Sequence, residues 1–172
     1  MKVLLIIDMQ KDFLTGSLAN ADGVAIIDNV KNVIDHFDGT IVFTRDTHND
    51  DYLSTNEGKH LPVEHCILGT EGHKIVPELL QAVAEKPHLI YNKYSFGMKN
   101  IAQKLKTDIG QIDSIELCGV CTDICVVSNA LLLKANFPEI PIAVRANCCA
   151  GLTKQKHNSA LDVMQSCQIE IL

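Results

Sequence analysis

The stretch Val3-Leu4-Leu5-Ile6-Ile7-Asp8 decides how the fold is interpreted. Five branched apolar residues in a row are typical of a strand that is covered on both faces, and the run stops abruptly at a carboxylate. Similar short apolar runs recur at residues 41–43, 89–91, 115–117, 142–144 and 169–172. The sequence therefore predicts about six buried strands.

Stretches with helical periodicity lie between these runs. They are residues 24–37, 73–85, 100–106, 123–135 and 153–167. The alternation of strands and helices implies right-handed crossovers and a mostly parallel sheet, which gives an α/β fold, a three-layer α/β/α sandwich. Because 172 residues leave little room for a second unit, we expect a single domain over residues 1–172.

Composition and charge disfavour several classes of protein. Hydrophobic residues make up 47% and charged residues 21%, which is ordinary globular usage. A net charge of −6 without any basic run argues against nucleic acid as a partner. No apolar stretch reaches the length of a membrane span and no signal peptide is evident, so we expect a cytoplasmic protein without a membrane partner.

Reactive side chains follow the ends of four predicted strands. Asp8 follows the first, Asp46 and His48 follow the second, Lys93 the third, and the turn from Gly119 to Cys125 the fourth. In open parallel sheets, ligands bind outside the carboxyl ends of the strands. The pattern therefore predicts that a carboxylate, a possible metal pair, an amine and a thiol meet at one rim.

Cys125 is the best nucleophile candidate among the seven cysteines, because a helix is expected to start near Thr122 or Asp123. Free N–H groups and the dipole at a helix N-terminus stabilise a thiolate, and the same N–H groups can form an oxyanion hole. An ammonium placed between Asp8 and the thiol would favour both ionised forms. Asp8 is a plausible general base.

A thiol redox or zinc-binding module built on Cys118, Cys121 and Cys125 is the non-enzymatic alternative. It lacks a second Cys-x-x-Cys pair at a usual distance, and it leaves Asp8 and Lys93 without a role. Five cysteines are interpreted as small packing residues: Cys66, Cys118, Cys148, Cys149 and Cys167.

Residues 46–72 form a long polar interval with little periodicity, and compact domains rarely keep such loops without a function. Asp46 and His48 are two residues apart on an extended segment, which is a compact start to a metal site. Further donors follow in the same interval: Glu57, His60 and His65. A mixed carboxylate and imidazole set suits Zn²⁺, Fe²⁺ or Mn²⁺.

Five segments, in this order, resemble motifs of the isochorismatase-like cysteine hydrolase superfamily, and the nicotinamidase/pyrazinamidase branch is most similar. The likeness covers nearly the whole chain. The segments are Ile6 to Phe13, Thr44 to His48, His65 to Gly72, Asn92 to Phe96, and Gly119 to Val126.

The resemblance implies a catalytic triad and an oxyanion hole. The triad would be Asp8, Lys93 and Cys125, and the oxyanion hole would use the backbone amides of Cys121 and Cys125, next to a cis peptide bond between Val120 and Cys121. A cysteine of this kind attacks a small amide, ammonia leaves, and the resulting thioester is hydrolysed.

The resemblance also implies one divalent metal ion, Zn²⁺ first, with Fe²⁺ or Mn²⁺ as alternatives. Its ligands would be Asp46, His48, Glu57 and His65, with His60 as the rival of Glu57. In nicotinamidases this metal also binds the pyridine nitrogen of the substrate. A homo-oligomer is expected on the same basis.

The chain departs from the family pattern near the substrate. The family often has Trp-Pro-x-His-Cys where this chain has the segment Leu61 to Cys66, which contains an extra residue and no aromatic ring. We expect Phe13, Leu61 and Tyr94 to line the substrate pocket. The expected activity is hydrolysis of nicotinamide or a similar small amide, and the alternative is a metal-independent isochorismatase or carbamoyl amidohydrolase of the same superfamily.

Overall fold

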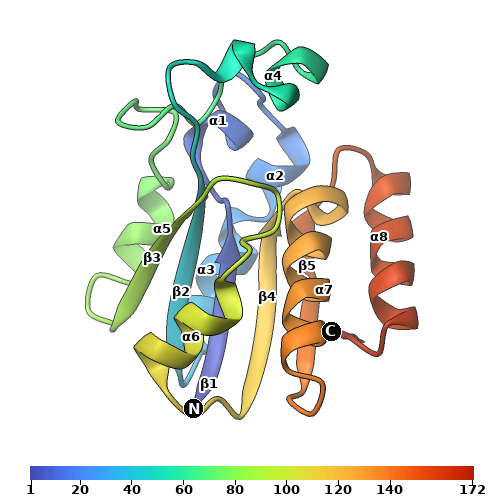
Figure 1. Ribbon diagram of the computed structural model, residues 1–172. Helices are drawn as coiled ribbons and strands as arrows, with labels where there is room; N and C mark the ends of the chain where they lie inside the picture. The colour runs from blue at the N-terminus through green and yellow to red at the C-terminus, as the bar shows by residue number, and fades with distance from the viewer.

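A computed structural model describes all residues, 1–172. Its centre is a six-stranded sheet in the order β3-β2-β1-β4-β5-β6, and every pairing is parallel (Figure 1). The strands are β1 (Lys2–Ile7), β2 (Thr40–Asp46), β3 (His88–Lys93), β4 (Ser114–Val120), β5 (Ile142–Ala150) and β6 (Glu170–Ile171). The predicted parallel sheet of about six strands is therefore confirmed.

Strand β1 lies inside the sheet, between β2 and β4. Leu5 is opposite Val42 on one side and Leu117 on the other. Residues 3–7 are completely buried, because helices cover both faces of the sheet and leave no side of the strand to solvent. The order of the sheet reverses its direction of growth between β1 and β4, and such a switch point is where open α/β sheets bind ligands.

The helices form the two outer layers of the sandwich, as predicted. Helices α3 and α5 pack together on one face, and α6, α7 and α8 pack on the other (Figure 1). None of the helices has the length and apolar content required to cross a membrane. The helices are α1 (Lys11–Leu14), α2 (Ala21–Ala25), α3 (Ile27–His36), α4 (Asn56–His60), α5 (Pro77–Ala82), α6 (Ile101–Ile109), α7 (Val127–Asn136) and α8 (Lys154–Ser166).

Three predicted segments differ from the structure. The helix expected over residues 24–37 is two helices that meet at Ile26. The helix expected over residues 73–85 covers only Pro77–Ala82, because proline occupies the first helical turn and Val76 before it is extended. The long interval 46–72 contains a 3₁₀ turn and α4, whose start is capped by the Thr55 hydroxyl accepting from the Gly58 N–H at 3.0 Å.

The cysteine prediction needs one correction. Cys66, Cys118, Cys148 and Cys149 are buried, in agreement with a packing role, whereas Cys167 is exposed. Cys167 directly follows α8, where the chain turns toward β6 at the surface. It is therefore a solvent-facing thiol and contributes nothing to the core.

Candidate active site

The nucleophile candidate lies in a π-helical turn, Thr122–Val126, that joins β4 to α7. The peptide bond between Val120 and Cys121, just before this turn, is cis. Gly119 has a φ of 116°, and an added Cβ there would overlap the carbonyl oxygen of Ile7. Glycine thus lets the end of β4 approach β1 closely, which brings the turn beside Asp8.

The structure brings the three predicted catalytic residues together. Lys93 Nζ lies 2.7 Å from Asp8 Oδ2 and 3.4 Å from Cys125 Sγ. Asp8, Lys93 and Cys125 are 0%, 2% and 5% exposed. Lys93 is the last residue of β3, opposite Asp46 in the register, and its side chain reaches past β2 to the end of β1. A buried cation therefore contacts both a carboxylate and a thiol.

Asp8 has one satisfied and one available carboxylate oxygen. The Thr44 hydroxyl donates to Oδ1 at 2.7 Å. Oδ2 faces the Lys93 ammonium but has no aligned hydrogen-bond donor, and it is the only buried side-chain nitrogen or oxygen in this condition. Burial raises the pKa of Asp8, and the positive charge of Lys93 opposes this shift. Asp8 Oδ2 can therefore accept a proton from a neighbouring group.

The charge state of the other two members follows from their surroundings. Burial alone would lower the pKa of Lys93, but Asp8, Cys125 and Asp46 raise it well above its ordinary value. Burial, and then the negative charge of Asp8, raise the pKa of Cys125 well above its ordinary value, against the effect of Lys93. Burial and the charge of Asp8 thus oppose the stabilisation of a thiolate by the nearby ammonium.

Four predicted metal ligands converge beside this group. The ligand atoms of Asp46, His48, Glu57 and His65 all lie within 4.8 Å of one another. His48 Nε2 is 3.0 Å from Asp46 Oδ2 and 3.7 Å from Glu57 Oε1, and His65 Nε2 is 3.8 Å from each of these oxygens. Ligands around tetrahedral zinc are about 3.3 Å apart, so this set fits a divalent ion with only small shifts.

Further contacts orient these donors. His65 Nδ1 is hydrogen-bonded to the Val63 carbonyl at 2.8 Å, which directs Nε2 into the cluster. Burial would raise the pKa of Asp46, but the hydrogen bond with His48 and the charge of Lys93 lower it to about 2. His60, the rival ligand, is exposed, and its Nδ1 is hydrogen-bonded to the Asn56 carbonyl at 2.8 Å. Glu57 therefore occupies the cluster and His60 does not.

Gln10 supports the cluster and is a site residue that the sequence alone does not predict. Its Oε1 accepts from the Asp46 N–H at 2.7 Å, and its Nε2 donates to the carbonyl oxygens of Asp46 and His73 at 2.9 and 3.0 Å. The side chain is fully buried. The available signal is an uncharged polar residue directly after the buried Met9, because a buried amide needs partners.

A pocket of about 950 Å³ opens onto Cys121 and Cys125. Phe13, Leu61 and Tyr94 all line it, as expected. The Phe13 ring lies 5.5 Å from the His65 ring, so one apolar wall stands next to the metal donors. The lining of the pocket includes the carboxylates of Asp46 and Glu57 but no lysine or arginine. This pocket suits a small ligand.

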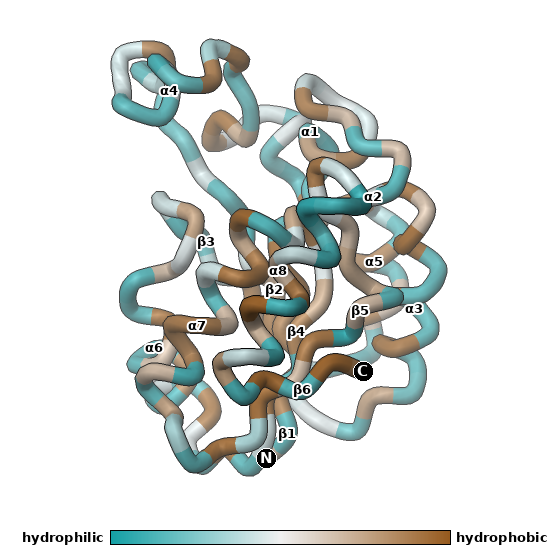
Figure 2. The backbone as a smooth tube through the Cα atoms, turned by 90° about the vertical axis from the view of Figure 1, so that its right-hand side faces the viewer, coloured by the Kyte–Doolittle hydropathy of each residue, from teal (hydrophilic) through white to brown (hydrophobic).

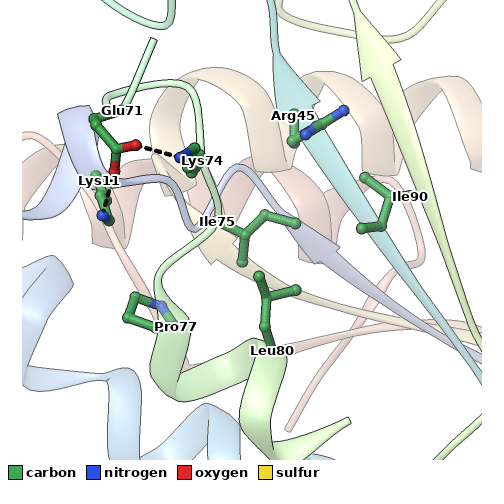
Figure 3. A pocket seen from close by; sticks show the side chains of 8 residues that line it. All are labelled: Lys11, Arg45, Glu71, Lys74, Ile75, Pro77, Leu80 and Ile90. Atoms are coloured by element: carbon green, nitrogen blue, oxygen red, sulfur yellow. Dashed lines mark hydrogen bonds and ion pairs between the residues drawn. The ribbon is translucent and has the colours of Figure 1, made fainter. Parts of the chain in front are cut away.

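A second hollow of about 260 Å³ lies on the outer side of β2 and β3 (Figure 3). Figure 3 shows Glu71 between Lys11 and Lys74, and both lysines form ion pairs with it. Arg45 stands apart, with its Nε donating to Asn92 Oδ1 at 2.9 Å. No member of the triad or the donor cluster lines this hollow, so the chemistry belongs to the larger pocket.

Comparison with known proteins identifies the family. The model of the isochorismatase domain matches residues 2–172. The nicotinamidase/pyrazinamidase of Mycobacterium tuberculosis is 27% identical over 100% of this chain and 98% of its own length, and the nicotinamidase of Saccharomyces cerevisiae is 26% identical over 76% and 80%. The crystal structure of a Pyrococcus horikoshii pyrazinamidase in complex with zinc is 26% identical, with a TM-score of 0.83 over 99% of this chain and 98% of that one. The chain therefore belongs to the isochorismatase family and is an amidohydrolase.

Proposed function

We propose that this enzyme hydrolyses nicotinamide, or a similarly small uncharged amide, to the acid and ammonia through a thioester on Cys125. The observation that carries this proposal is the buried group of Asp8, Lys93 and Cys125 beside the four-donor cluster, with Cys125 and all four donors lining one pocket. The similarity to a nicotinamidase and to a nicotinamidase/pyrazinamidase supports the substrate class.

The first half of the reaction forms the thioester. Cys125 Sγ attacks the amide carbonyl carbon while its proton passes to Asp8 Oδ2, the oxygen without an aligned donor. The backbone N–H groups of Cys121 and Cys125 donate to the oxyanion that develops. The carbon–nitrogen bond then breaks, and Asp8 returns the proton to the departing nitrogen, which leaves as ammonia.

The second half regenerates the thiol. Water gives a proton to Asp8 and adds its oxygen to the thioester carbonyl carbon; the carbon–sulfur bond breaks, and Cys125 recovers the proton. Lys93 remains protonated throughout, because its ion pairs with Asp8 and Asp46, at 2.7 and 3.0 Å, hold its charge in the buried site. It thereby offsets the negative charge on Asp8 before each proton transfer.

The donor cluster orients the substrate in this proposal. Asp46, His48, Glu57 and His65 would hold the ion, with Zn²⁺ as the first candidate, in agreement with the zinc complex of the Pyrococcus horikoshii relative. A divalent ion held there supplies a Lewis-acid site for a ring nitrogen of the substrate. Phe13 would pack against the ring, and its position beside His65 supports that role.

The charge of the pocket separates this proposal from its nearest rival. Isochorismate carries carboxylates, and the lining of this pocket contains no lysine or arginine to pair with them. An uncharged amide needs none. A carbamoyl compound remains the second candidate on the same ground, and it is distinguished by its substrate profile.

Ammonia release tests the proposal directly. Nicotinamide, pyrazinamide, a carbamoyl amine and isochorismate are compared, the last by a product assay, with and without added Zn²⁺, Fe²⁺ or Mn²⁺. We expect turnover of the first two, and a loss of about 10³-fold or more for Cys125→Ala. Cys167→Ala is the matched control and should retain full activity, because that thiol is exposed and does not line the pocket. Normal ammonia release by Cys125→Ala would overturn the mechanism, and turnover of isochorismate alone would overturn the substrate class.

A further inference from the structure

Asn129 is a buried amide four residues after the nucleophile, in the first turn of α7. Its side chain is 0% exposed and makes three hydrogen bonds, all to backbone atoms. Nδ2 donates to the carbonyl oxygen of Cys125 at 2.8 Å and to that of Phe96 at 3.1 Å, and Oδ1 accepts from the Met98 N–H at 2.9 Å. One amide thus joins two separate segments.

Both segments belong to the active site. The first is the π-helical turn that carries Cys125. The second, residues 94–98, follows Lys93 directly: the Ser95 carbonyl accepts from Lys93 Nζ at 3.3 Å, and Tyr94, Ser95 and Phe96 line the substrate pocket. Asn129 therefore links the segment that follows the ammonium to the turn that carries the thiol.

The packing leaves little room for an alternative arrangement. An added Cβ on Gly97 would lie 2.6 Å from Leu132 Cδ1 and 3.3 Å from Ser128 Cβ, so residues 94–98 lie directly against α7. The backbone approaches the helix closely enough for a short amide to reach two carbonyls and one N–H. A longer side chain would push the segment away, and an apolar one would leave a buried N–H and two buried carbonyls with fewer partners.

We propose that Asn129 is a positioning residue for the hydrolysis, which fixes Cys125 Sγ relative to Lys93 Nζ and Asp8 without touching the substrate. This inference rests on the proposed function, but its central claim concerns the geometry of the thiol and is measurable without any amide. It predicts that changes at position 129 alter the reactivity of Cys125 and the turnover number more than substrate affinity.

The test uses Asn129→Leu, which keeps the approximate size and removes all three hydrogen bonds, and Asn129→Ser, which is smaller and perturbs packing less. The matched control is Asn136→Leu on the same helix, where Nδ2 donates to the Leu132 carbonyl at 2.8 Å in an exposed position. All variants carry Cys167→Ser to remove the exposed thiol. Folding is checked by circular dichroism and thermal unfolding.

Two readouts separate positioning from a purely structural role. The first is the rate of Cys125 alkylation by iodoacetamide between pH 6 and 9, located by tandem mass spectrometry in the absence of substrate. The second is kcat and KM for nicotinamide. We expect both Asn129 variants to shift the pH profile of alkylation and to lower kcat by about tenfold to a hundredfold, with a smaller change in KM. Asn136→Leu should match the parent.

Folded Asn129 variants with the parent alkylation profile and kcat would overturn the inference and leave Asn129 a structural residue. If Asn129→Leu does not fold, Asn129→Ser decides by the same criteria. If the parent hydrolyses none of the amides, the proposed function fails while the alkylation profiles still decide the role of Asn129. The two hypotheses can therefore fail separately.

Discussion

Asp8 Oδ2 is the buried oxygen on which the proposed proton transfers depend, and it predicts an acidic limb in the pH profile. The carboxylate has to be ionised to accept the thiol proton, and burial raises the pKa of Asp8 above that of an ordinary aspartate. Activity should therefore fall on acidification at a higher pH than a solvent-exposed aspartate would require. The measurement is kcat/KM for nicotinamide against pH, at saturating metal.

The Asp8→Asn variant provides the control for that assignment. The amide keeps the shape of the carboxyl group but cannot accept a proton, so we expect kcat to fall by about 10³-fold. Thr44→Val removes only the hydroxyl that donates to Oδ1, and it should move the acidic limb rather than abolish turnover. An Asp8→Asn enzyme with a substantial fraction of the parent activity would refute Asp8 as the base.

At the scale of elements, α8 packs against the nucleophile turn and forms a side-chain hydrogen bond with it. Thr122 Oγ1 and His157 Nδ1 are 2.8 Å apart, and burial lowers the pKa of His157 below its ordinary value. A histidine whose pKa is lower in the folded state stabilises the protein above its unfolded pKa of about 6.5, and this contribution is lost as the pH falls through the folded value. The contribution of His157 to the stability of the fold therefore decreases on acidification.

The expected result is a pH-dependent difference between the parent and His157→Asn. In urea unfolding with a chelator present, the parent should be more stable at pH 7.5 by less than about 1 kcal/mol, because His157 is partly exposed and solvent screens the effect. The difference should shrink at pH 5. The other histidines are the same in both proteins, so their contributions to the pH dependence of the free energy of unfolding cancel in the comparison. A difference that grows on acidification would contradict the expected sign.

The elements also show which structural features can be predicted from the sequence. Strands such as β1 can be predicted because a strand covered on both faces has a continuous run of apolar residues. The ends of the predicted strands then indicate where Asp8 and Lys93 lie. Helix α4 is not predictable in this way: it has five residues, is largely hydrophilic in Figure 2, and has no apolar stripe, yet it carries Glu57. Two of the three hydrogen-bond partners of Asn129, Phe96 and Met98, lie about 30 residues away, and no local pattern encodes those contacts.

At the scale of the whole molecule, one apolar cluster predicts one unfolding transition. The cluster contains 39 buried residues from the strands and from helices on both faces of the sheet. Because no face has a separate core, we propose that residues 1–172 unfold as a single domain, with coincident transitions by fluorescence and far-ultraviolet circular dichroism. Tyrosine fluorescence serves as the probe, since the chain has no tryptophan. Two separated transitions in the metal-free protein would contradict this expectation.

Metal binding should stabilise the fold, because the donor set exists only when the end of β2, α4 and the loop after α4 are assembled. Asp46 ends β2, Glu57 comes from α4, and His65 comes from the loop that follows it. An ion that binds the folded protein alone adds stability in proportion to the logarithm of its concentration, about 2.7 kcal/mol at one hundred times its dissociation constant.

We expect Zn²⁺ to raise the urea midpoint of the parent and of His60→Gln equally, since His60 lies outside the cluster. Glu57→Gln should show a clearly smaller gain at the same free Zn²⁺, because one of four ligands is lost. If Zn²⁺ stabilised Glu57→Gln as much as the parent, Glu57 would not be a metal ligand. If Zn²⁺ did not stabilise the parent, the cluster would not be a metal site.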